Sequence, residues 1–177
     1  EGATDESWTH VQQSIEDDWQ RGNPVGDAED PSNAYSGSNV WGNDLGAGTA
    51  WNGKYKSNAK NYLRSPEIDT TGFDRVFVEY ARWLAIDNSF NDVAQVRANG
   101  DLAWENPNDS TLIDTAWSIQ NHDISSAAAD RVDAKVRWTL EANGSTNYGG
   151  WNIDDVKIIG LKAATGNTDR LNLGGST

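Results

Sequence analysis

The side chains of this sequence that could carry out chemistry are two histidines and many carboxylates. His10 and His122 lie far apart in the chain, and neither belongs to a zinc-binding pattern such as His-Glu-x-x-His. The chain has no cysteine, no Gly-x-Ser-x-Gly turn for a nucleophilic serine and no glycine-rich loop with a lysine for phosphate. The sequence therefore predicts no catalytic residue.

The carboxylates include adjacent pairs, at Asp17-Asp18, Glu29-Asp30 and Asp154-Asp155. A glycosidase needs two carboxylates roughly 5 to 10 Å apart across a cleft. Adjacency in sequence does not supply this, because neighbours on a strand point to opposite faces of the sheet. Some pair will always look suggestive among 27 acidic residues, so a small jelly-roll lyase or glycosidase remains only an alternative.

Composition excludes several classes of protein. The chain has 14 basic and 27 acidic residues, so its net charge is −13 and it would repel nucleic acid. No apolar run approaches the ~20 residues of a membrane span. The acidity indicates a solvated surface and a soluble monomer, and it also offers the oxygen ligands that calcium prefers. The 177 residues fit one domain, and without any methionine we expect them to belong to a larger product.

The elements that must position these side chains are strands. Apolar residues alternate with charged ones from Val132 to Leu140, and Asn99-Gly100 is a strong hairpin signal. One short stretch, 125–130, fits a single turn of helix. The other expected strands are 7–13, 18–21, 76–86, 93–98 and 151–159.

These short strands, separated by Gly- and Asn-rich turns, predict an all-β fold. We expect a two-sheet antiparallel β-sandwich of jelly-roll type over residues 1–161. The pattern fades after it, so residues 162–177 are expected to be a tail or linker.

Four motifs occur in order along the chain, at Asp18–Pro24, Ser36–Leu45, Tyr62–Asp69 and Gly149–Val156. Together they resemble the MAM-like jelly-roll domain, in particular the version attached to secreted bacterial peptidases of the immune inhibitor A type. The resemblance covers roughly residues 8 to 160. The chain departs from animal MAM domains in having no disulfides, and the segment 46–61 is longer than the usual link between the second and third motifs.

The resemblance implies a structural cation, usually calcium or sodium, near the first strands and the final aspartate pair. The candidate ligands are Asp44, Asp154, Asp155 and Asn39. Strand alternation predicts that Asp154 and Asp155 point to opposite faces, so at least one of them needs a partner. The alternative is that one aspartate accepts a backbone N–H and holds a turn while the other is solvated.

The nine tryptophans fall into two groups. We expect Trp138, Trp83 and Trp151 in the core. The others of interest lie in polar stretches rich in Gly, Asn and Pro, where an indole can either stack on a sugar ring or close an end of the sandwich through an Nε1–H bond to a loop carbonyl. The candidate sugar ligands are Trp51 and Trp104, followed by Trp41 and Trp117.

We therefore expect a non-catalytic, extracellular binding and accessory module. It would be part of a larger secreted protein, and we expect that protein to be a hydrolase. Its expected partners are a glycan or protein surface and the catalytic domain of the parent. The alternatives are a carbohydrate-binding module that uses exposed tryptophans and a cell-surface adhesion domain.

Overall fold

The computed structural model describes residues 7–14, 17–46 and 51–163. Most of the expected tail at 162–177 lies outside the described residues. The regular secondary structure of the described chain is almost all β-strand, as expected, with one helical turn, α1 (Ser125–Ala128). No helix in this part of the chain is long and apolar enough to span a bilayer.

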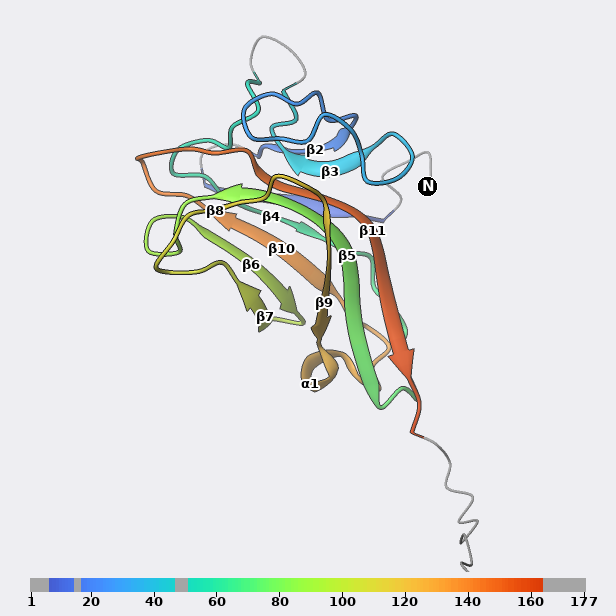
Figure 1. Cartoon of the computed structure of the whole chain (residues 1–177). Coiled ribbons are helices and arrows are strands. Elements are labelled where there is room, and N and C mark those ends of the chain that lie inside the picture. Colours follow the sequence, from blue (N-terminus) through green and yellow to red (C-terminus); the bar gives the residue numbers. More distant parts are fainter. Residues whose placement is uncertain (1–6, 15–16, 47–50, 164–177) are drawn as a thin grey trace, which may run out of the picture.

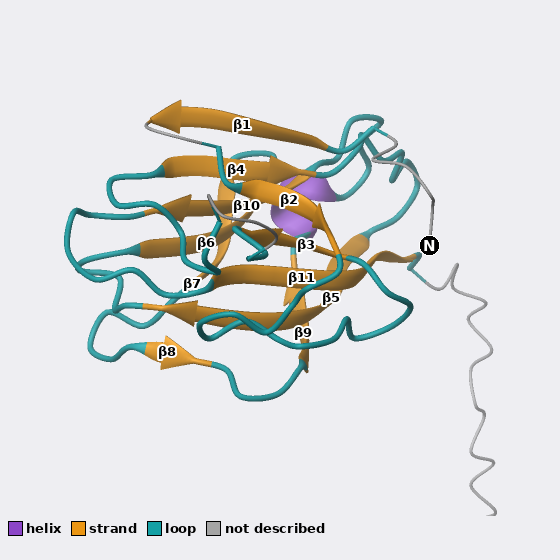
Figure 2. Ribbon diagram, turned by 90° about the horizontal axis from the view of Figure 1, so that it is seen from above, coloured by secondary structure: helices purple, strands orange, loops and turns teal. Residues whose placement is uncertain are grey.

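The strands form two antiparallel sheets, which confirms the predicted β-sandwich (Figure 2). The five-stranded sheet has the order β1 (Thr9–Ser14), β4 (Lys60–Arg64), β10 (Val136–Glu141), β6 (Val93–Ala98) and β7 (Asp101–Glu105). The six-stranded sheet has the order β2 (Trp19–Gly22), β3 (Val40–Asn43), β11 (Gly150–Leu161), β5 (Arg75–Ile86) and β8 (Leu112–Ile113), and β9 (Ser118–Asp123) also pairs with β5.

The core lies between the two sheets and is built around aromatic rings. Trp138 on β10 and Trp151 on β11 are fully buried, and the Tyr80 ring meets the Trp138 ring edge-on at 5.4 Å between centroids. The core position expected for Trp83 is wrong. Trp83 is half-buried outside the core cluster, and its Nε1–H donates to the Glu29 carbonyl oxygen at 2.7 Å. Glu29 lies in the loop between β2 and β3. Its bond to Trp83 places this loop against the outer face of β5, so the outward-facing indole is partly covered.

The predicted hairpin at Asn99-Gly100 is confirmed, whereas the strand expected from Val132 starts later in the chain. Asn99 and Gly100 both have positive φ, 46° and 102°, and join β6 to β7 as the hairpin signal predicts. The strand expected from Val132 starts only at Val136, because the preceding segment is tied to the loop after β4. The Ile68 and Ala134 backbones bridge there, and the Val132 side chain is 72% exposed.

The loop between β2 and β3 positions most of the polar residues discussed below. It joins the edge strand β2 of the six-stranded sheet to its neighbour β3 (Figure 1). Its residues bond to side chains on β11 and β5. Alternate residues of β11 have opposite roles: Trp151 and Ile153 are in the core, while Asn152 and Asp154 meet this loop.

Candidate functional site

The aspartate pair of β11 holds the loop between β2 and β3. The Asp154 Oδ2 accepts a bond from the Ser36 backbone N–H at 3.0 Å, and the Asp155 Oδ1 accepts from the Ser36 hydroxyl at 2.7 Å. Asp155 has φ 48° in a β-bulge, which interrupts the alternation of the strand. Both carboxylates therefore bond the same serine, and the prediction that they point to opposite faces is wrong.

Asp44 has a similar role in another loop. Its side chain is fully buried, and its two oxygens accept backbone N–H bonds from Gly46, Asn52 and Gly53 at 3.2 to 3.3 Å. The Lys56 ammonium lies 3.6 Å from its Oδ2. Asp44 thus already has an internal counter-charge and internal donors.

The structure does not gather the four expected cation ligands into one group. Asp154 and Asp155 meet at Ser36, Asn39 is half-buried, and Asp44 accepts backbone N–H bonds from Gly46, Asn52 and Gly53. Within residues 7–14, 17–46 and 51–163, no three histidine or acidic side chains lie close enough together to hold a metal ion. A cation bound here would need amide or carbonyl oxygens as well as carboxylates.

A different pair of side chains does leave oxygens unused. Asn152 donates its Nδ2–H to the Asp30 Oδ1 at 2.7 Å, and both residues are buried, at 0% and 7% exposure. Within the described part of the chain, the Asp30 Oδ2, the Asn152 Oδ1 and the Oε2 of the adjacent Glu29 accept no hydrogen bond. Burial raises the pKa of Asp30 to about 8, against the opposing effect of the Asn152 bond.

These orphaned oxygens fit a hard cation. A buried oxygen without a donor costs free energy, and a carboxylate with an amide oxygen is a donor set that calcium accepts. Gly149 passes so close that a Cβ there would lie 2.6 Å from the Asp30 Oδ1. The backbone therefore packs tightly around this pair.

A second buried carboxylate is fully satisfied. The Asp18 Oδ1 accepts bonds from the Asn43 and Asn61 amides at 2.9 and 2.7 Å, and its Oδ2 accepts from the Lys56 N–H at 3.3 Å. Burial raises the Asp18 pKa to about 6, and these three donors limit the rise. Asn43 also accepts the Trp151 N–H at 3.0 Å, so this network joins strands of both sheets.

The four candidate tryptophans have different surroundings. Trp104 packs on the Trp151 ring, and the Arg82 guanidinium lies 5.2 Å from its centroid. The half-buried Trp117 donates its Nε1–H to the Asn33 carbonyl oxygen at 3.0 Å, which is the loop-closing role. The half-buried Trp51 has the Lys56 ammonium 5.1 Å above its ring.

The fourth, Trp41, lines a surface pocket. Trp41 is 8% exposed, and its ring lies tilted against the rings of Trp8 and His10, with centroids 6.2 and 5.8 Å away. The pocket, of about 410 Å³, lies beside β2 and β3, and we call it the Trp41 pocket. Two indoles and four polar side chains line it, those of Trp19, Trp41, His10, Gln20, Arg21 and Asn23.

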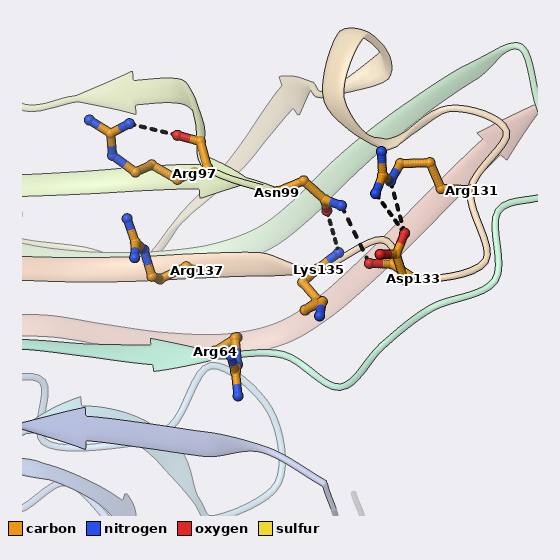
Figure 3. Close-up of a pocket in the computed structure, with 8 residues that line it drawn as sticks. Arg64, Arg97, Asn99, Arg131, Asp133, Lys135 and Arg137 are labelled. Atoms are coloured by element: carbon orange, nitrogen blue, oxygen red, sulfur yellow. Dashed lines mark hydrogen bonds and ion pairs between the residues drawn. The ribbon is translucent and has the colours of Figure 1, made fainter.

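A second pocket, of about 360 Å³, lies on the five-stranded sheet and is strongly basic (Figure 3). Arg64, Arg137 and Arg97 lie on the neighbouring strands β4, β10 and β6. We call these three the arginine row. Arg131 and Lys135 complete its basic lining, and Asp133 is its one carboxylate.

Sequence reasoning noted some of these residues without finding their role. Glu29-Asp30 is visible as an acidic pair, and Asn152 lies two positions before Asp154 on the same face of a strand. Their meeting depends on the path of a loop, for which the sequence has no local signal. The arginine row depends on the register of three strands that are distant in the chain.

No protein-family model matches the sequence, and no curated protein matches it. Among solved structures, the fold is similar to the K1 cleaved adhesin domain of Lys-gingipain from Porphyromonas gingivalis W83, with a TM-score of 0.58 and 16% identity over 88% of this chain and 91% of that chain. The K2 cleaved adhesin domain of Lys-gingipain gives 0.51 and 21% over 86% and 88%. The chain shares the β-sandwich fold of these adhesin domains.

A further similar structure is that of TmCBM61 in complex with β-1,4-galactotriose. Its TM-score is 0.49 and its identity 12%, over 88% of this chain and 89% of that chain.

Proposed function

We propose that this chain is a non-catalytic, extracellular binding and accessory module of a larger secreted protein, and that it docks its parent on a glycan surface. The MAM-like resemblance and the shared fold of adhesin domains support a binding role. Fold alone does not assign function, so a binding role requires a site on the molecule.

The observation that carries the proposal is the Trp41 pocket. Its volume of about 410 Å³ is in the range of small-molecule sites. Its lining combines amide, imidazole and guanidinium groups with the small exposed edges of two core indoles, Trp19 and Trp41, which are 3% and 8% exposed. The polar groups can bond the hydroxyls of a sugar, while the indole edges form an apolar floor for its C–H groups. This composition favours a neutral oligosaccharide, and it supports the carbohydrate-binding alternative in particular.

We also propose a structural calcium, held by Asp30 and Asn152 with Glu29 beside them. Asp30 and Asn152 fit the ion because they are buried and keep oxygens without donors, and the half-buried Glu29 adds a buried Oε2 that also has no donor. When bound, calcium would supply positive charge to a buried carboxylate and fix the loop between β2 and β3 on the six-stranded sheet. Asp154 and Asp155 would contribute by holding Ser36 of the same loop.

The test is binding of a panel of neutral oligosaccharides, measured by calorimetry and tryptophan fluorescence in calcium. We expect one member to bind, and Asn23→Ala together with Arg21→Gln to weaken it by about tenfold. Asn121→Ala, an exposed change on β9, is the matched control and should leave binding intact.

Two other outcomes would replace the proposal. Sugar release from a polysaccharide, lost when one carboxylate is neutralised, would mean a lyase or glycosidase. Association of the chain with itself in calcium but not in chelator, without any glycan binding, would mean an adhesion domain.

A further inference from the structure

We propose that the arginine row on the five-stranded sheet binds a carboxylated polysaccharide, one that carries a uronate. The inference rests on the proposed function as a glycan-binding module, and it adds a second site with a ligand of a different charge. Three features carry it: the register of the row, the partners of its guanidinium groups, and the basic pocket around them.

The register places three positive charges directly opposite one another. Arg137 on β10 pairs with Arg64 on β4 and with Arg97 on β6. Like charges in directly opposite positions of a sheet destabilise it. A chain with 27 acidic residues has ample side chains to neutralise such a row. The fold instead keeps the arrangement, which indicates that the row serves a ligand.

No carboxylate within the described residues forms an ion pair with the row. The Arg64 Nε–H donates to the Thr9 hydroxyl at 3.1 Å, and Arg97 donates to the Gln95 amide oxygen and the Gly100 carbonyl at 2.8 and 2.7 Å. The Arg137 guanidinium lies 4.9 Å from the Tyr62 ring centroid. Neutral groups thus orient the three guanidinium groups and leave donors for an anion.

The nearby carboxylates are used elsewhere. Asp133 is 2.8 Å from the Arg131 guanidinium, and Glu67 is 2.9 Å from the Lys135 ammonium. Asn99, at the hairpin, bonds the backbone of the same segment, donating to the Asp133 carbonyl and accepting from the Lys135 N–H (Figure 3). These bonds hold one end of the pocket in place, and the Asp133 and Glu67 carboxylates pair with Arg131 and Lys135 instead of with the arginine row.

The spacing and the neighbouring residues favour a polysaccharide with single, separated charges. Adjacent strands are about 4.8 Å apart, which is close to the length of one sugar residue, so each strand can offer one arginine per sugar. Guanidinium groups pair with carboxylates through two parallel bonds. The next row along the same face includes Tyr62 and Gln95, which contact the Arg137 and Arg97 guanidinium groups and so hold the arginine row in place.

The charge of the whole chain argues against a dense polyanion. The net charge of −13 repels nucleic acids and heavily sulfated chains. Screening at physiological salt limits that repulsion to about 8 Å, so a short, sparsely charged segment can still reach a local basic row.

The experiment is calorimetry of the whole chain with tri- and tetragalacturonate, which are short enough not to gel with calcium. We expect binding that weakens with salt, a loss of affinity of about tenfold in Arg137→Gln, and no detectable binding in Arg64→Gln/Arg137→Gln. The matched control is Arg75→Gln, which removes the same charge from an exposed arginine on β5 that pairs with Asp123. It should retain affinity within about twofold. Thermal unfolding shows whether each variant is folded.

The outcomes separate this inference from the proposed function. If neutral oligosaccharides bind and uronates do not, the inference is wrong and the proposed function stands. If neither class binds, both are wrong. If Arg75→Gln lost as much uronate affinity as Arg137→Gln, or if DNA or dextran sulfate bound as tightly as the uronates, the binding would be a nonspecific effect of positive charge. Either result would overturn the inference.

Discussion

Asp30 and Asn152 lie 122 positions apart in the chain and are joined by one hydrogen bond of 2.7 Å, from the Asn152 Nδ2–H to the Asp30 Oδ1. The bond uses one oxygen of Asp30 and the amide nitrogen of Asn152. The second oxygen of Asp30 and the amide oxygen of Asn152 stay buried without a donor among the described residues. This pair connects the loop between β2 and β3 to the centre of the six-stranded sheet.

The first prediction concerns calcium and this pair. A ligand that binds only the folded chain, at 100 times its Kd, adds about 2.7 kcal/mol to the free energy of unfolding. We expect calcium to raise the melting temperature of the wild type and to have no effect on Asp30→Asn. The control is Asp155→Asn, which should keep the calcium response. If calcium no longer raised the melting temperature of Asp155→Asn or Asp44→Asn but still raised that of Asp30→Asn, the ligands would be those expected from the sequence and not Asp30.

The second prediction concerns Asn43. Asn43→Ala removes a bond to the buried Asp18 carboxylate and the acceptor of the Trp151 N–H. Leaving two buried polar groups without partners should lower the free energy of unfolding by about 2 to 4 kcal/mol. Urea unfolding of the variant and the wild type measures this change in the free energy of unfolding. The exposed change Asn121→Ala should cost less than about 0.5 kcal/mol, and a similar small loss in both variants would contradict the importance of the network.

The third prediction concerns pH and His122. Burial lowers the pKa of His122, and the nearby Arg82 charge lowers it further. As the pH falls through 6.5, the His122 imidazole becomes protonated in the unfolded chain but stays neutral in the folded chain. The free energy of unfolding therefore decreases. We expect the stability difference between wild type and His122→Gln to shift against the wild type from pH 8 to pH 5. A constant difference would show that His122 titrates normally, and NMR of the imidazole checks its pKa directly.

The fourth prediction distinguishes the two roles of Trp117. Because its Nε1–H bonds the Asn33 carbonyl, Trp117→Phe should lower the free energy of unfolding by about 1 kcal/mol. Glycan affinity should stay unchanged, since the indole closes a loop. If calorimetry shows weaker glycan binding with unchanged stability, Trp117 is a sugar ligand.

Local patterns in the sequence predict much of the fold and less of the sites. The alternation of Val136, Trp138 and Leu140 with polar residues places that strand and its buried face, and Asn99-Gly100 locates a hairpin. The sequence predicts a core position for Trp83, on a strand whose two faces are both partly apolar. Burial of the outer face depends on a loop that folds over it, and alternation carries no information about such a cover.

The candidate sites depend on residues that distant segments bring together. Asp155 illustrates the limit: its left-handed backbone at the bulge turns both aspartates toward Ser36, and strand alternation cannot predict a bulge. The arginine row shows the same limit between strands. Arg64, Arg97 and Arg137 are unremarkable singly, and only the register makes them neighbours.

The order of strands in the sheets also determines when the chain can fold. The last two strands of the described chain occupy inner positions: β10 lies between β4 and β6, and β11 lies between β3 and β5. The five-stranded sheet therefore cannot be completed before residue 141 has left the ribosome, nor the six-stranded sheet before residue 161. The sandwich can therefore close only after its last strand has been made, and because its strand pairs are distant in sequence, we expect folding to be slow. Before that point the aromatic strands lack their partner strands, and we expect their apolar side chains to be exposed.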